Sequence, residues 1–148
     1  MEGSTALVSI RPIYAEKIIS GEKRLEFRRR WTSKKVDFIV IYATSPVKKV
    51  VAIAQVGEVF RGSKSRLWEL ARDKKGGITR RKLYEYMEGA SEGVALELSS
   101  ILKVKQGLGL LDLFGADFHP PQSFRYLNTK QKEQLEVTAG DNMWVSYS

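Results

Sequence analysis

The chain has 148 residues, 43% of them hydrophobic and 10% aromatic, which is enough for a folded domain with a buried core. It has no cysteine and one histidine, His119, so thiol nucleophiles, disulfides and thiolate metal sites are excluded. The formal net charge of +8 is concentrated in residues 1–82, whose 20 basic and 8 acidic side chains favour a polyanionic partner.

The first elements predict a strand, a helix and a second strand. Residues 6–10 have strand composition, and Pro12 suits the first turn of a helix that ends near Ser20, where Gly21 can take a left-handed conformation. Residues 24–28 then alternate polar and apolar with period two, the pattern of a strand with one face in the core. The side chains expected in the core are Tyr14, Ala15, Ile18, Ile19, Leu25 and Phe27, with Arg24, Glu26 and Arg28 on the opposite face of the strand.

The middle of the chain predicts two long strands followed by two helices. After a basic linker, residues 36–44 and 49–60 are rich in β-branched and aromatic residues, and we expect two central strands with both faces covered. Residues 66–72 and 79–88 have helical spacing, with the breaker 74–77 between them. We therefore expect a two-helix insertion.

The last third returns to strand and closes with a helix. Residues 93–104 alternate as a strand, 108–114 are a short apolar segment, and 119–122 form a turn or extended loop. Asn128 and Gln131 have the spacing of a capping box for a helix to about residue 137, and residues 143–145 are a candidate closing strand. This order is not the alternation of a doubly wound sheet. It predicts a single α+β domain over residues 1–148, a small mixed β-barrel with peripheral helices.

The densest polar cluster lies between Gly21 and Arg30. A strand would place Glu26 and Arg28 on one face, where both side chains could act on one ligand, with Lys23 at the mouth of the strand. The alternative is a cross-strand ion-pair ladder on a solvated face, which contributes little to stability. The pattern leaves both interpretations open.

Other catalytic arrangements are poorly represented. A Ser–His pair would have to use His119, which precedes two prolines, and Gly107-Leu108-Gly109 lacks the third glycine of a dinucleotide fingerprint. No carboxylate spacing marks a magnesium site. We therefore predict no bound metal and no cofactor. Aromatic residues near basic ones can stack on unpaired bases, and the best candidates for exposure are Tyr42, Tyr86 and Phe124.

Several of these segments together resemble ASCH domains. Residues 9–12, 14–15 and 18–28 are similar to the opening signature of that family, whose core G-x-K-x-x-E-x-R falls on Gly21, Lys23, Glu26 and Arg28. Four later segments also match the layout of the family, and the resemblance covers roughly residues 5–127. These segments are residues 41–46, 56–59, 86–89 and 121–126.

The resemblance implies a PUA-like β-barrel, a cleft lined by the motif strand, and a role in binding RNA or other nucleic acid. The family also includes nucleases and small amidohydrolases that deacylate an acetylated cytidine nucleoside. In that amidohydrolase branch the lysine matches Lys23, but a threonine nucleophile stands where this chain has Glu26, so the same nucleophilic mechanism cannot operate here. A further glutamate of the insertion would correspond to Glu69 or Glu85.

Two functional hypotheses follow. In the first, the protein binds RNA, another single strand or a nucleotide, with a base held in a basic cleft. In the second, it is an enzyme of the ribonuclease or amidohydrolase type that uses Lys23 and Glu26 on RNA or a modified nucleoside. No export signal or membrane-length apolar run is apparent, so we expect a cytoplasmic protein without a membrane partner. The candidate nucleic-acid-binding residues are Arg11, Lys23, Arg24, Glu26, Arg28, Arg29, Arg30, Tyr42, Lys48, Lys49, Arg61, Tyr86, Gln122, Phe124 and Arg125.

Overall fold

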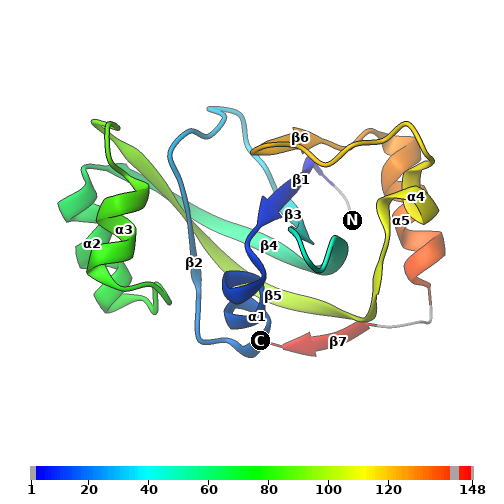
Figure 1. The fold of residues 1–148 in the computed structure, drawn as a ribbon, viewed down its shortest axis with the longest axis horizontal. Helices are drawn as coiled ribbons and strands as arrows, with labels where there is room; N and C mark the ends of the chain where they lie inside the picture. The colour runs from blue at the N-terminus through cyan, green and yellow to red at the C-terminus, as the bar shows by residue number, and fades with distance from the viewer. Residues whose placement is uncertain (1–2, 141–143, 148) are drawn as a thin grey trace.

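Strands dominate the fold, which is seen here in a computed structural model that describes the backbone of residues 3–140 and 144–147 and the side chains of residues 3–140 (Figure 1). The strands form one sheet in the order β2-β5-β4-β3-β1-β6, with β7 also paired to β5. Among the described strands, β1 and β3 are the one parallel pair, and the other pairs are antiparallel. The elements are β1 (Thr5–Ile10), α1 (Pro12–Ser20), β2 (Leu25–Arg28), β3 (Phe38–Ala43), β4 (Lys49–Gly62), α2 (Lys64–Asp73), α3 (Arg80–Tyr86), β5 (Gly93–Leu108), α4 (Leu110–Phe114), β6 (Phe124–Tyr126), α5 (Thr129–Ala139) and β7 (Trp144–Tyr147).

The sheet is curled around its two longest strands. β4 has 14 residues and β5 has 16, and three register shifts interrupt their pairing, as β-bulges do where a sheet bends. Figure 1 shows α2 and α3 beside one end of these strands and α4 and α5 at the opposite end. The predicted α+β class is confirmed, as are the mixed barrel-like sheet, the peripheral helices and the two-helix insertion.

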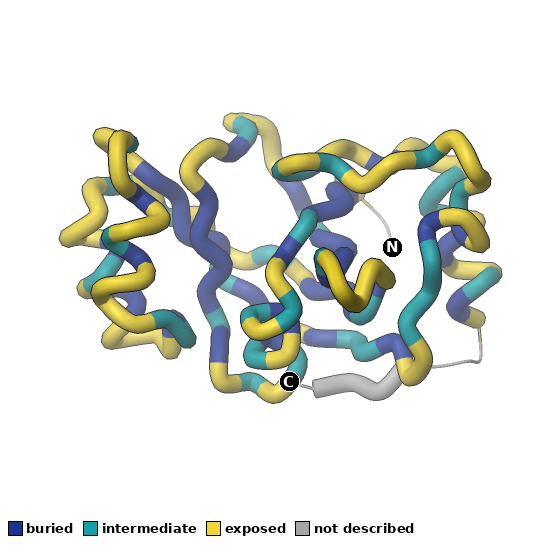
Figure 2. Tube along the Cα trace, in the orientation of Figure 1, coloured by how far each residue is buried: buried dark blue, intermediate teal, exposed yellow. Residues whose placement is uncertain are grey.

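Three hydrophobic clusters hold the helices on the sheet. The central cluster includes Ala15 and Ile18 of α1, a second cluster joins β3 to α4 and α5, and a third joins β2 to α2 and α3. Figure 2 shows the buried chain concentrated in the middle of the sheet, while the outer faces of α2 and α3 are exposed. Tyr14 and Ile19 were expected in the core, but they are only half-buried because each lines a cavity.

Local sequence signals account for several element ends. α1 begins at Pro12 and ends before Gly21, whose φ of 86° is the left-handed conformation that glycine adopts without strain. The capping box of Asn128 and Gln131 is present at the start of α5. The closing strand is β7, paired with β5, whereas Met143 of the predicted segment lies outside the described residues.

The expectation of two central strands is correct for β3 and only half correct for β4. The side chains of β3 alternate between the central cluster and the α4–α5 cluster, so both faces are covered. β4 loses β3 as a partner after Gln55, and beyond that point it pairs only with β5. The second half of β4 is therefore largely exposed. The three-residue strand β6, which pairs with β1, had no counterpart in the predicted elements.

In the part of the chain that the structure describes, every helix is too short or too polar to cross a membrane.

Candidate functional site: a cavity beside the motif strand

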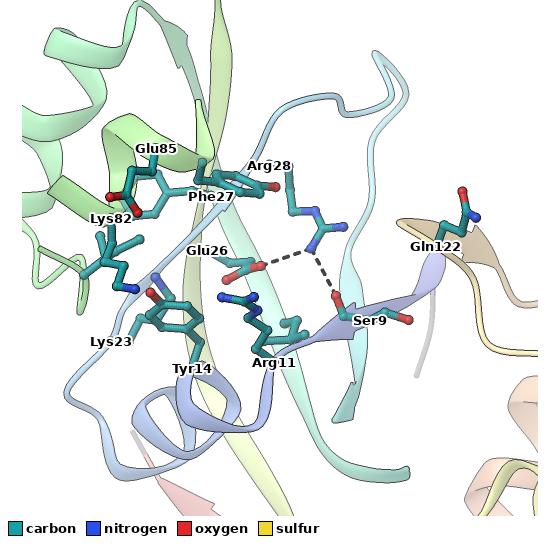
Figure 3. A pocket seen from close by; sticks show the side chains of 13 residues that line it. Ser9, Arg11, Tyr14, Lys23, Glu26, Phe27, Arg28, Lys82, Glu85 and Gln122 are labelled. Carbon is teal, nitrogen blue, oxygen red and sulfur yellow. Dashed lines mark hydrogen bonds and ion pairs between the residues drawn. The ribbon is translucent and has the colours of Figure 1, made fainter. Parts of the chain in front are cut away.

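A cavity of about 520 Å³ lies where the β1–α1 junction, β2 and α3 meet (Figure 3). β2 pairs with β5 on one side only, so the other edge of β2 is open to this space. Glu26 and Arg28 of β2 line this cavity and are buried, so the solvated ion-pair ladder considered above does not form. The lining residues are Ser9, Ile10, Arg11, Tyr14, Lys23, Glu26, Phe27, Arg28, Ile78, Lys82, Glu85, Tyr86 and Gln122.

Glu26 and Arg28 form a buried ion pair on β2. Their relative exposures are 6% and 7%, and Arg28 Nη1 donates to Glu26 Oε2 over 3.1 Å. The same guanidinium donates to the Ser9 carbonyl at 3.3 Å and, through Nη2, to the carbonyl and hydroxyl oxygens of Ser123 at 3.1 and 2.9 Å. Arg28 thus joins β2 to β1 and to the segment before β6. Both of its terminal nitrogens therefore donate to protein atoms.

Lys23 lies two residues before the start of β2, with only 2% of its surface exposed. Its Nζ donates to the carbonyl of Gly76 over 2.7 Å and lies 5.2 Å from the ring centroid of Tyr14 and 4.7 Å from that of Phe27. Burial lowers the pKa of Lys23 to about 8; the negative charge of Glu26 opposes this shift and the nearby Lys17 adds to it. With this pKa, the Lys23 side chain is mostly protonated at pH 7 and loses its proton as the pH rises through about 8.

The segment 74–77, predicted as a helix breaker, also covers Lys23. The Lys75 carbonyl accepts from the backbone N–H of Arg24 over 2.7 Å, next to the bond from Lys23 to Gly76. Gly77 has a φ of +64°, and a Cβ at this position would lie 2.5 Å from the Cβ of Lys23. A glycine is needed here both for the backbone conformation and for the close approach.

The structure brings six of the fifteen predicted binding residues to the cavity: Arg11, Lys23, Glu26, Arg28, Tyr86 and Gln122. Among those outside its lining, Arg29 donates to the Glu88 carbonyl, Arg61 donates to the Thr32 carbonyl, and Arg125 stacks 3.9 Å from the Phe118 ring centroid. The full set outside the lining is Arg24, Arg29, Arg30, Tyr42, Lys48, Lys49, Arg61, Phe124 and Arg125.

The three aromatic candidates have different environments. The expected exposure of Tyr42 is wrong: it is 6% exposed because β3 alternation places it in the α4–α5 cluster. Phe124 is half-buried, with its ring centroid 4.6 Å from that of Trp31. Tyr86 lines the cavity and is 40% exposed, so its ring is open to a ligand. Burial raises the pKa of the Tyr86 hydroxyl, with Arg28 lowering it and Glu26 raising it further.

Two lining residues of the insertion, Ile78 and Lys82, were not among the residues predicted from the sequence. Lys82, Glu85 and Tyr86 have the i, i+3, i+4 spacing of one helix face, a signal that would have grouped them once Tyr86 was chosen. Of the two glutamates left open, Glu85 lines the cavity, whereas Glu69 pairs with Arg66 at 3.2 Å outside it. Among the described residues, no group of three or more metal-ligating side chains could hold a metal ion.

Comparisons with known proteins agree with this fold and motif. The family model of the ASCH domain matches residues 8–105. An "ASCH domain-containing ribonuclease" of Zymomonas mobilis is 31% identical over 132 residues, which is 88% of each chain. The crystal structure of ASCH from Zymomonas mobilis superposes with a TM-score of 0.82 at 29% identity, covering 90% of this chain and 94% of that one. A serine-to-alanine variant of that protein gives a TM-score of 0.81 at 28% identity, with 90% and 95% covered.

Proposed function

This chain belongs to the ASCH domain family, and on that basis we propose that it is an RNA-binding protein that holds one unpaired nucleotide in the cavity beside β2. The observation that carries the proposal is a carboxylate and an ammonium group, Glu26 and Lys23, buried in the same cavity. The Glu26 carboxylate can accept a hydrogen bond from the exocyclic amino group of a base, and the ring of Tyr86 can stack on the same base. A volume of about 520 Å³ suits a single nucleotide better than a duplex.

Basic residues outside the cavity extend this proposal to the RNA on either side of the bound nucleotide. Six of the predicted binding residues are exposed and lie outside the lining: Arg29, Arg30, Lys48, Lys49, Arg61 and Arg125. Such residues contact phosphates without reading sequence. The proposal treats residues 1–148 as a single domain and places the protein in the cytoplasm, where RNA is available.

The test is a salt-titrated binding series with single-stranded RNA, single-stranded DNA, duplex DNA and free cytidine nucleotides. We expect single-stranded RNA to bind, with log affinity falling against log salt by about 0.7 for each phosphate contacted. Preferential binding of duplex DNA would contradict the occupancy of the cavity by one unpaired nucleotide. Absence of binding to any of these ligands would reject the proposal.

A second candidate is an RNA-cleaving enzyme of the same cavity. It is favoured by the lowered pKa of Lys23, about 8, beside the buried Glu26, and by the ribonuclease name of the Zymomonas mobilis relative. In this scheme Glu26 acts as general acid or base and Lys23 stabilises negative charge on the phosphate. Mass spectrometry of the RNA after incubation distinguishes the candidates. Cleavage products that disappear in both Glu26→Gln and Lys23→Met would show that the protein is an enzyme that uses these residues. RNA that stays intact with the unmodified chain would support the RNA-binding function alone.

A further inference from the structure

Two cationic side chains enter the cavity from different walls. Arg11 precedes α1, and Lys82 belongs to α3; Figure 3 shows both side chains directed into the space between these elements. Both residues are exposed, whereas Lys23 and Glu26 are buried, so Arg11 and Lys82 lie at the mouth and the motif residues lie deeper. Within residues 3–140, neither of these two side chains has a hydrogen bond or an ion pair.

The carboxylates of the cavity do not neutralise this pair. Glu26 is bound by Arg28 at 3.1 Å, and Glu85 is bound by Arg81, also at 3.1 Å. Arg11 and Lys82 therefore retain their charges without a protein partner in a space that is also positive through Lys23. An anion at the mouth would be attracted by both side chains.

We infer that Arg11 and Lys82 form a phosphate subsite, which holds the phosphate group of the nucleotide whose base lies at Glu26. The inference rests on the proposed function and specifies which part of the ligand each wall contacts. An arginine binds two phosphate oxygens through its planar fork, and a lysine acts as a point charge on the same group. A phosphorylated ligand should therefore bind more tightly than the corresponding nucleoside.

The test compares cytidine with its 3′- and 5′-monophosphates by NMR titration of the full chain. Charge-assisted hydrogen bonds of this kind should make at least one monophosphate bind about 10- to 100-fold more tightly than cytidine. Arg11→Gln and Lys82→Gln should each remove most of this advantage, and in the double variant the monophosphates should bind no more tightly than cytidine. Arg72→Gln and Lys34→Gln make the same charge changes at exposed positions outside the lining and should preserve the advantage.

Failure of the subsite and failure of the proposed function give different results. The phosphate subsite is wrong if cytidine binds in the cavity but its monophosphates bind less than about twofold more tightly, or if their advantage survives in the double variant. In either case the proposed base site at Glu26 still stands. If neither cytidine, its monophosphates nor single-stranded RNA binds the unmodified chain, the proposed function fails and the subsite fails with it.

Discussion

Burial of an ammonium group at Lys23 makes stability depend on pH. The pKa of Lys23 is about 8 in the folded protein and 10.5 as its ordinary value, so between these values the unfolded chain binds more protons. The free energy of unfolding should therefore rise with pH across this window, by up to about 3 kcal/mol, and the penalty of the buried charge is fully present below pH 8.

Urea unfolding between pH 7 and 9.5 measures this contribution. In Lys23→Met the pH-dependent gain should disappear, whereas Lys130→Met should retain it because that side chain is exposed and does not contribute to the pKa shift of Lys23. Tyr86 does not interfere, since its raised pKa keeps the phenol neutral over this range. Equal pH slopes in the unmodified chain and in Lys23→Met would show that the charge of Lys23 is not destabilised by burial.

Glu26 is expected to select bases that carry an amino group. The Glu26→Gln variant keeps the size of the side chain and can still accept from Arg28, but it presents an amide donor to the cavity. Preference for cytidine over uridine monophosphate should fall by about 10- to 100-fold, the range of one good base contact. Competition binding of the two nucleotides measures the ratio. Glu69→Gln removes an exposed carboxylate outside the lining and should leave the ratio intact; an unaltered ratio in Glu26→Gln would exclude Glu26 as the base contact.

At the scale of elements, the 74–77 segment couples the insertion to the motif strand. Gly77→Ala would place a Cβ against the Lys23 side chain at a positive φ, so we expect a loss of about 2–4 kcal/mol in unfolding free energy. Gly21→Ala is the matched control, because its φ is +86° and a Cβ there meets nothing within 4 Å. It should cost only about 1–2 kcal/mol, the strain of the left-handed conformation. Equal losses in denaturant unfolding would mean that the close approach to Lys23 is not limiting.

The elements that sequence predicted are those with local signals. Pro12 and Gly21 bound α1, and Asn128 with Gln131 caps α5, because caps and helix ends depend on neighbouring residues. β6 has three residues and depends on pairing with β1, a contact that no local pattern reveals. The insertion could be predicted as two helices, but its attachment over Lys23 depends on tertiary packing.

The candidate site divides in the same way. Period two predicted that Glu26 and Arg28 share a face, and both line the cavity. Tyr14 and Lys82 come from α1 and α3, so only the folded arrangement brings them to the same space. Tyr42 was misplaced because strand alternation does not tell which face carries the cavity. Spacing identifies a face, and the packing of other elements decides what that face meets.

At the scale of the whole molecule, Arg28 joins parts of the curled sheet that strand pairing leaves apart. β2 and β6 are the two ends of the strand order, and backbone pairing does not join β2 to β1 or β6. The guanidinium of Arg28 spans this opening through Ser9 and Ser123 while it neutralises Glu26. The same group that positions Glu26 in the cavity therefore also closes the sheet around it.

Loss of this connection should destabilise the whole fold. Arg28→Met leaves a buried carboxylate without its counter-ion and should lower the unfolding free energy by about 3–5 kcal/mol in urea denaturation. Adding Glu26→Gln removes the orphaned charge, so the double variant should recover part of the loss, a coupling measured by the double-mutant cycle. Arg61→Met removes an exposed arginine with one carbonyl contact and should cost no more than about 0.5 kcal/mol. If Arg28→Met were as mild as Arg61→Met, side-chain closure of the sheet by Arg28 would be excluded.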